Sequence, residues 1–131
     1  MAYWLLKTEP SCYSFADLET EKQTRWDGIT NAQALKYLRE FKKGDQALIY
    51  HTGDERAVVG IAEVTTNAYV DPKLGDPKLA VVDLKPVRRL KTPITLAEIK
   101  ADESFQDFAL VRQGRLSVVP VTAAQWKKLA K

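Results

Sequence analysis

The apolar segments of this chain are rich in β-branched residues and follow one another without regularly spaced helices between them. Five such runs predict strands, at residues 3–7, 46–51, 58–69, 79–90 and 116–121. Strands and helices do not alternate as βαβ units, which disfavours a doubly wound parallel sheet. The pattern instead favours an α+β fold, a mixed β-barrel of about five to six strands with short helices around it.

Capping signals mark where the helices begin. Four are present: Ser14 before Phe15, Asn31 before a helix over 32–41, Thr95 with Glu98, and Thr122 with Gln125.

Three further features refine this pattern. Residues 102–110 are predicted to be helical. Gly60 lies within the long strand 58–69 and predicts a bulge or a close approach of another group. Pro120 restricts the last strand to an edge of the sheet or to a strand end, because proline lacks the N–H that a central strand needs.

The length of 131 residues predicts a single domain over residues 1–131. A net charge of +3 permits a polyanionic partner without requiring one. Basic residues cluster at Lys42–Lys43, at Lys85–Lys91, at Arg112 with Arg115, and at Lys127–Lys128. A nucleic-acid track would need several of these clusters on one face. The single cysteine, Cys12, excludes an internal disulfide and fits a reducing compartment.

Nothing in the sequence predicts a membrane segment or a secretion signal. No apolar stretch approaches the length that spans a bilayer, and no charged region followed by an apolar run opens the chain. We therefore expect no membrane partner and a cytoplasmic location, or a nuclear one if the host has a nucleus.

Several kinds of catalytic and ligand-binding machinery are missing. The six glycines are scattered, without the spacing of a phosphate loop or a dinucleotide site. No His or Cys cluster has the spacing of a metal site, so neither a metal nor a cofactor is expected. His51 is the one candidate general base. Its candidate partners lack diagnostic spacing: Thr8, Thr52, Ser117 or Cys12 as nucleophile, and Glu9 or Asp27 as orienting acid.

Aromatic and polar residues gather where apolar runs end. Trp26 and Asp27 precede Asn31 closely, and Tyr50 and His51 end another run. Ends that meet in space line a shared cavity. Trp26 as an ordinary core residue is one reading. The other is a ring that stacks on a flat heterocycle while its polar neighbours read the edge. His51 is either a satisfied buried residue or a donor and acceptor aimed into the same pocket.

The chain resembles the EVE domain family of the PUA-like superfamily, which is related to YTH and ASCH domains. The resemblance spans essentially the whole chain in the expected order. The matching stretches are Tyr3 to Pro10, Tyr13-Ser14, Asp17-Leu18, Trp26 to Ile29 with Asn31, Gln33-Ala34, Gly44-Asp45, Tyr50 to Thr52, Val59 to Val64, Ala68-Tyr69 with Asp71-Pro72, and Leu110 to Val118 with Pro120-Val121.

The resemblance implies a PUA-like barrel that reads modified bases in DNA or RNA, with no cofactor. A base would be captured out of its stack, held on an aromatic ring and read along its edge. Trp26 would stack on the base, and Glu9, Asp27 and Asn31 would read it. The implied pocket residues are Thr8, Glu9, Trp26, Asp27, Asn31, Tyr50, His51, Tyr69 and Ser117. The implied phosphate contacts are Lys7, Arg112 and Arg115.

The chain departs from the family pattern at several positions. Thr30 stands where the family usually has Arg, and Ala32 where a large aromatic is common. Leu35-Lys36 replace an Arg-Asn pair, and Leu79 stands near a common aromatic position. The loop over residues 71–78 is also short, so an aromatic cage could lack one wall.

Three functions remain open from the sequence. The leading one is a non-catalytic, monomeric module that binds a modified nucleobase, a modified cytosine or adenine, in DNA or RNA. It would act with a protein partner or in a sensing and housekeeping role. The second is a hydrolase acting on a modified nucleobase or nucleoside, in which a desolvated Lys7 serves as base. The third is a protein-interaction domain with a vestigial pocket.

Overall fold

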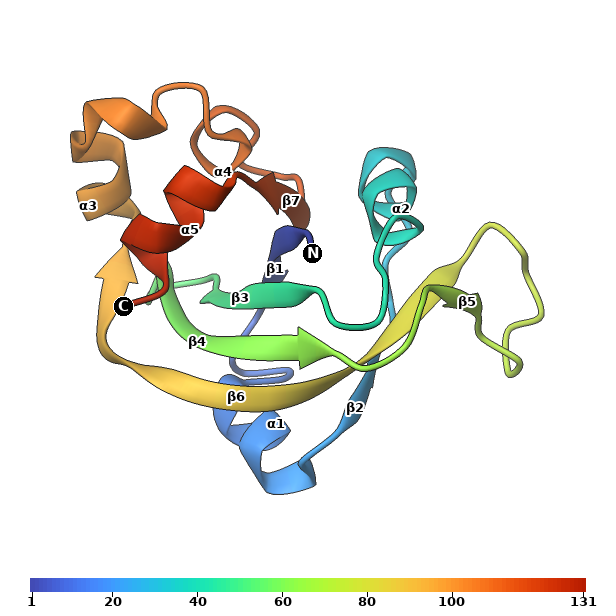
Figure 1. Cartoon of the computed structure of the whole chain (residues 1–131). Helices are drawn as coiled ribbons and strands as arrows, with labels where there is room; N and C mark the ends of the chain where they lie inside the picture. The colour runs from blue at the N-terminus through green and yellow to red at the C-terminus, as the bar shows by residue number, and fades with distance from the viewer.

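Seven strands form one curled mixed sheet in the computed structural model, which describes all 131 residues (Figure 1). The strands are β1 (Tyr3–Thr8), β2 (Thr24–Trp26), β3 (Gln46–His51), β4 (Ala57–Val64), β5 (Tyr69–Val70), β6 (Ala80–Thr95) and β7 (Val118–Val121). Their order is β2-β6-β4-β3-β1-β7, with β5 paired to β6. Only β1 and β3 are parallel. The predicted α+β class is therefore confirmed, as a sheet curled into a half-barrel.

Short helices surround this sheet. They are α1 (Phe15–Glu21), α2 (Ala32–Leu38), α3 (Leu96–Ala101), the 3₁₀ helix η1 (Glu103–Phe105), α4 (Ala109–Arg112) and α5 (Ala123–Leu129). Figure 1 shows α3, α4 and α5 gathered at one end of the sheet, while β5 and its following loop project at the other.

The predicted helix starts are confirmed by side-chain caps. Ser14 and Thr122 each form a complete capping box, and Asn31 accepts a hydrogen bond from the backbone N–H of Ala34. Thr95 accepts from the N–H of Glu98. Each cap satisfies a backbone donor that the first helical turn leaves free.

The predictions for Gly60 and Pro120 are also confirmed. The register between β4 and β6 shifts between Val58 and Gly60. A Cβ atom on Gly60 would lie 2.5 Å from the ring of Phe15, so glycine lets α1 pack directly on the sheet. Pro120 lies in β7, an edge strand of the sheet.

The prediction of one strand over 58–69 is wrong. β4 ends at Val64, and the chain bends before β5 begins at Tyr69. The backbone of Asp83 on β6 holds the bend, because its carbonyl accepts from the N–H of Thr65 and its N–H donates to the hydroxyl of Thr66. These partners are distant in the sequence, so strand propensity could not reveal the break.

Other boundaries shift for similar reasons. β6 runs on past Leu90 because Ala57 and Val58 pair with its last residues. The helix predicted over 32–41 ends at Leu38, and the one over 102–110 divides into η1 and α4. The three-residue strand β2 was not predicted. It forms because Trp26 pairs with Val82 on β6.

The core fills both faces of the central strands. Trp4, Leu5 and Leu6 of β1 are all buried, which needs cover on each side of the strand. The buried polar residues are Asp45, His51 and Asp71. No helix combines the length and the apolar character that crossing a membrane requires.

Candidate functional site

A cavity of about 450 Å³ opens where β1 and β2 end. This size lies within the usual range for small-molecule sites. We call it the tryptophan cavity. Its lining residues are Lys7, Thr8, Glu9, Tyr13, Thr24, Arg25, Trp26, Asp27, Gly28 and Ile29. The cavity therefore joins the two earliest segments that the sequence singled out, Lys7–Glu9 and Trp26–Ile29.

A tight turn after β1 brings three consecutive residues to this cavity. Side chains alternate along a strand, so Thr8 should face away from Lys7 and Glu9. The carbonyl of Glu9 accepts hydrogen bonds from the N–H groups of Cys12 and Tyr13, which turns the chain. The hydroxyl of Thr8 closes the turn by donating to the carbonyl of Tyr13 at 2.6 Å.

Two aromatic rings form the apolar wall. Trp26 is buried, with 7% of its surface exposed. Tyr13 packs edge-on against it, with ring centroids 6.0 Å apart. The hydroxyl of Tyr13 donates to Glu21 at 2.8 Å. Burial, with Glu21 beside the hydroxyl, raises the pKa of Tyr13 to about 12, so the ring stays neutral.

The segment that follows Trp26 also lines the cavity, and its polar groups form no hydrogen bond within the protein. No hydrogen bond within the protein involves the backbone of Asp27, Gly28 or Ile29, or the carboxylate of Asp27. Gly28 has a φ of +80°, which glycine adopts without strain. This short segment therefore offers N–H donors and C=O acceptors to a bound molecule.

Arg25 lies at the cavity in a fixed position. Its Nε donates to the hydroxyl of Tyr69 at 3.0 Å, and its Nη1 pairs with Asp71 at 3.1 Å. Tyr69 in turn donates to Asp83 at 2.6 Å. The hydrogen bond to Tyr69 raises the pKa of Arg25. Tyr69, predicted to line the pocket, thus stands behind Arg25 and holds it.

Lys7 and Glu9 are both constrained. The Nζ of Lys7 donates to the carbonyl of Gly114 at 2.8 Å and lies 5.9 Å from the centre of the Tyr50 ring. Burial lowers the pKa of Lys7. Glu9 accepts from the N–H and hydroxyl of Ser11 and from the hydroxyl of Thr52. The bonds from Ser11 lower the pKa of Glu9.

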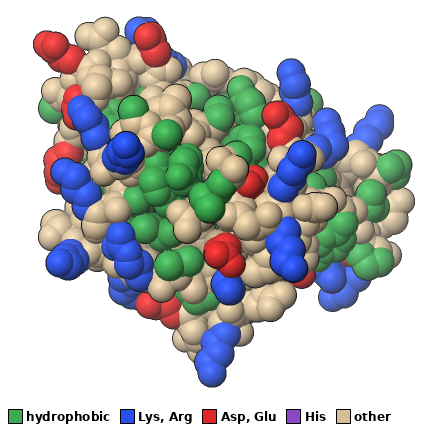
Figure 2. Space-filling model, in the orientation of Figure 1, with side chains coloured by type: hydrophobic (Ala, Val, Ile, Leu, Met, Phe, Trp, Pro, Cys, Tyr) green, Lys and Arg blue, Asp and Glu red, His purple; other side chains and the backbone are tan.

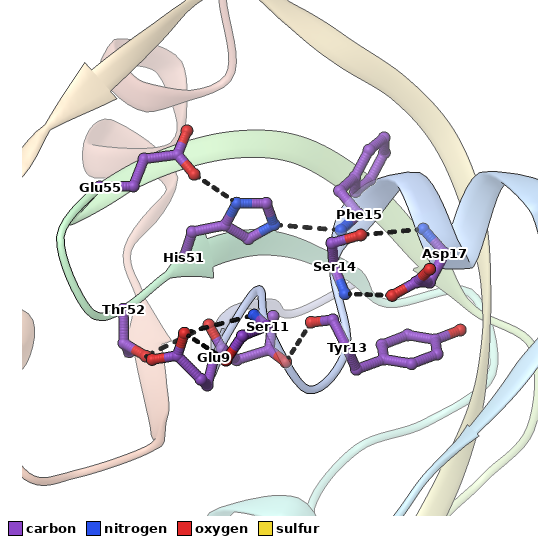
Figure 3. A network of polar contacts seen from close by, with 10 residues as sticks. Glu9, Ser11, Tyr13, Ser14, Phe15, Asp17, His51, Thr52 and Glu55 are labelled. Carbon is purple, nitrogen blue, oxygen red and sulfur yellow. Dashed lines mark hydrogen bonds and ion pairs between the residues drawn. The ribbon is translucent and has the colours of Figure 1, made fainter.

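His51, a predicted pocket residue, is not among the residues that line the tryptophan cavity. Figure 3 shows it between the start of α1 and Glu55. Its Nε2 accepts from the N–H of Phe15 at 3.0 Å, and its Nδ1 contacts Glu55 at 2.6 Å. The amide donor leaves Nε2 unprotonated and places the ring proton on Nδ1, toward Glu55. Both ring nitrogens are engaged within the protein, and His51 anchors the start of α1.

Three more predicted pocket residues, Tyr50, Ser117 and Asn31, are also absent from the lining of this cavity. Tyr50 is buried beneath Lys7 and lines a small neighbouring hollow of about 170 Å³. Ser117 contributes its carbonyl, which accepts from the N–H of Lys7. Asn31 caps α2 and lines a separate hollow together with Arg115.

Arg112, a predicted phosphate contact, is partly engaged within the protein. Its Nε donates to the carbonyl of Gln106 at 2.6 Å, and its Nη2 lies 3.8 Å from Asp107. Arg115, by contrast, makes no hydrogen bond or ion pair inside the protein and stays exposed.

Sequence reasoning missed several lining residues. Tyr13, Thr24 and Arg25 line the cavity but are not among the predicted pocket residues. Their common signal was the run that leads into Trp26. This run could have been interpreted as a short edge strand whose side chains lie near the end of β1.

A larger hollow of about 690 Å³ lies between the end of β6, α3 and α5. Glu98, Asp102 and Lys128 line it, and Lys128 is already paired with Asp102 at 3.3 Å. None of the predicted pocket residues reaches it. We therefore place the site at the tryptophan cavity, where aromatic and unused polar groups coincide.

Charged side chains are dispersed over the face of the molecule seen in Figure 2. Figure 2 shows Lys and Arg side chains spread around a central apolar area, with Asp and Glu side chains between them. Some basic side chains form ion pairs within the protein: Lys85 with Glu63, and Arg89 with Glu19. No group of three or more His, Cys, Asp or Glu residues could hold a metal ion.

Comparison with known sequences gives a consistent family. The model of the EVE domain matches residues 2–131. Thymocyte nuclear protein 1 of Danio rerio is 32% identical over 158 residues, covering 95% of this chain and 68% of that protein. The Homo sapiens protein is 30% identical over 159 residues, covering 95% and 71%. These alignments exceed the 131 residues of this chain, so the relatives carry insertions.

Solved structures share the fold. A protein from Rhodopseudomonas palustris has a TM-score of 0.93 at 40% identity, covering 98% of this chain and 90% of that one. Human thymocyte nuclear protein 1, in complex with DNA containing 5-methylcytosine, has a TM-score of 0.87 at 29% identity, covering 98% and 95%. An ASCH protein from Zymomonas mobilis, at 14% identity, has a TM-score of 0.60 and is similar in fold alone. The predicted PUA-like fold is thereby confirmed.

Proposed function

This chain belongs to the EVE domain family, and from that premise we propose that it captures a modified cytosine of DNA in the tryptophan cavity. One observation carries the proposal: the cavity is lined by two packed aromatic rings, Trp26 and Tyr13, and by the segment Asp27–Ile29, whose backbone forms no hydrogen bond within the protein. A flat base can stack its face on the aromatic rings and form hydrogen bonds along its edge with this backbone. The DNA complex of the human relative supports 5-methylcytosine as the ligand class.

Contacts to a captured base have to supply most of the affinity, because attraction to the DNA surface alone is expected to be weak. A net charge of +3, dispersed among acids, gives little attraction to an intact duplex. Flipping a base costs a few kcal/mol, and stacking on an aromatic ring returns about 1–3 kcal/mol. A buried methyl group adds about 0.8 kcal/mol, which is about a fourfold preference for the methylated base.

The residues at the cavity take distinct roles in this proposal. Trp26 and Tyr13 contact the faces of the base, and Asp27 with the following backbone reads its edge. Arg25 is a fixed donor, because Tyr69 and Asp71 hold its guanidinium in place. Lys7 and Arg115 contact phosphates beside the captured base.

Binding to matched duplexes tests the proposal. Fluorescence anisotropy would compare duplexes with one 5-methylcytosine or one cytosine at the same site, at a fixed salt concentration. We expect about fourfold tighter binding of the methylated duplex and a marked loss with Trp26→Phe. Asp54→Ala changes an exposed acid that forms no side-chain hydrogen bond, and it should bind like the wild type. Equal affinity of the wild type for both duplexes would overturn the proposal.

A second candidate function is hydrolysis of a modified nucleoside, and the position of Lys7 favours it. Lys7 lines the cavity beside Thr8 and Glu9, and burial lowers the pKa of its amine toward that of a general base. Incubation with free modified nucleosides, followed by chromatography, separates the two functions. The binding module leaves them intact, whereas product that disappears in Lys7→Met would identify the hydrolase.

The proposal needs one copy of the chain and no cofactor. We expect a monomer in solution, with DNA as the partner. The matching RNA oligonucleotide in the same titration tests the alternative polymer, and co-purification would reveal a protein partner.

A further inference from the structure

A second hollow, of about 250 Å³, lies beside the tryptophan cavity. We call it the amide hollow; its lining residues are Asn31, Gln33, Gln113, Gly114, Arg115 and Leu116. We propose that the amide hollow binds the nucleotide next to the captured base and selects adenine there. The inference rests on the proposed function of the tryptophan cavity, and it adds a sequence context to it.

The two hollows are neighbours through two connections. Lys7 lines the tryptophan cavity, and its Nζ donates at 2.8 Å to the carbonyl of Gly114, which lines the amide hollow. Ile29 lines the first and Asn31 the second, and two residues of chain span at most about 7 Å. A DNA strand that passes Lys7 therefore places consecutive nucleotides at the two hollows.

The side chains at the amide hollow suit a base edge. The chain has two Asn and six Gln residues, and three of these amides meet here. The side chains of Gln33 and Gln113 are exposed and form no hydrogen bond within the protein. Asn31 uses its Oδ1 to cap α2, which leaves its NH₂ group available. Asn and Gln are the side chains that pair with N6 and N7 of adenine.

The charge of the amide hollow suits the DNA strand. No carboxylate lines it, whereas Glu9 and Asp27 line the tryptophan cavity. Arg115 is free of hydrogen bonds and ion pairs inside the protein. Its guanidinium is thus available to the phosphate that joins the captured nucleotide to its neighbour.

A panel of duplexes tests the inference. Each carries one 5-methylcytosine, and the base on its 5′ or 3′ side is varied among all four. For the wild type we expect about tenfold tighter binding with adenine than with a pyrimidine on one of the two sides. The double variant Gln33→Ala/Gln113→Ala should bind all flanking bases within about twofold and keep its preference for 5-methylcytosine over cytosine. Gln106→Ala, at an exposed amide outside both hollows, should behave like the wild type.

Arg115→Ala gives an independent reading. It should weaken binding to every duplex of the panel alike and lower the slope of affinity against salt by about one. Equal wild-type affinity for all flanking bases would overturn the inference, as would a flanking preference that survives in the double variant. The wild type could keep the flanking preference and yet bind methylated and unmethylated duplexes equally. That result would overturn the proposed function while supporting recognition of the flanking base at the amide hollow.

Discussion

The ends of β2 and β3 carry similar residues and use them differently. Trp26-Asp27 ends or follows one strand, and Tyr50-His51 ends the other. At β3, both ring nitrogens of His51 are engaged by Phe15 and Glu55. At β2, no hydrogen bond within the protein uses Asp27 or the backbone that follows it. An aromatic and polar pair at a strand end therefore becomes structural where the fold supplies partners, and stays available for binding where it does not.

The position of each strand in the sheet explains the difference. β3 lies between β1 and β4, and α1 begins against its last residue. β2 is an edge strand paired only with β6, so the segment after Trp26 has no neighbouring strand to satisfy it. An edge strand leaves N–H and C=O groups without partners in the sheet, so they remain free to pair with another molecule.

The largest expected effect breaks the structural side of this comparison. His51→Ala removes two hydrogen bonds and leaves the buried N–H of Phe15 without a partner, so the free energy of unfolding should fall by about 2–3 kcal/mol. Urea denaturation would measure this loss. DNA affinity of the folded variant should stay within about twofold, because His51 does not line the cavity. If His51→Ala kept its stability but lost DNA binding, the end of β3 would have the binding role that we assign to the end of β2.

Gly60→Ala attacks the same anchor from the sheet side. The added Cβ would lie 2.5 Å from the Phe15 ring, which must shift and pull on its bond to His51. We expect a loss of about 1–3 kcal/mol of unfolding free energy. Because both changes act through Phe15, the double variant with His51→Ala should lose less than the sum. Strict additivity would show that the two contacts are independent.

Asp27→Ala tests the binding side. Asp27 is exposed and unbonded, so the free energy of unfolding should change by less than about 0.5 kcal/mol. Affinity for the methylated duplex should fall about fivefold, the equivalent of about 1 kcal/mol for one hydrogen bond. Anisotropy measures the affinity and calorimetry the stability. Asp54→Ala serves as the matched control, and a stability loss without a binding loss would contradict the prediction.

The smallest expected effect concerns Tyr13, which lines the cavity and also contributes to stability. Its pKa of about 12 in the fold exceeds the ordinary value of about 10, so the folded state holds the proton longer than the unfolded chain. Its contribution to stability is complete below pH about 10 and is lost as the pH rises toward about 12. Tyr13→Phe should therefore show a shallower fall of the urea midpoint over this window.

Burial also raises the pKa values of Tyr50 and Tyr69. These two residues contribute equally to the pH dependence of stability in the wild type and in Tyr13→Phe, so they cancel in the comparison. Identical slopes for the wild type and Tyr13→Phe would show that the Tyr13 hydroxyl is equally free in both states.

Local features of the fold could be predicted because they depend on neighbouring residues. The caps at Ser14 and Thr122 need only an acceptor and an N–H three residues apart. Pro120 signals an edge through its missing N–H, and Gly60 signals a close contact through its missing side chain. The break after Val64 escaped prediction because its partner, Asp83, lies elsewhere in the chain.

The sequence could predict which types of residue form the candidate site, but not which of them meet at one cavity. Lys7, Thr8 and Glu9 meet Trp26 and Asp27 at one cavity only because the chain turns after Glu9. Asn31 and Arg115 meet at a different hollow, and Tyr69 stands behind Arg25.

The sequence by itself determined the fold class, the helix caps, the family and the residue types that a base-binding pocket requires. Only the tertiary structure decided which polar groups are available for binding. Availability depends on partners far along the chain, such as Phe15 for His51 at a separation of 36 residues. A side chain that the fold satisfies is committed to stability, and one that the fold leaves unsatisfied at an edge is free to bind.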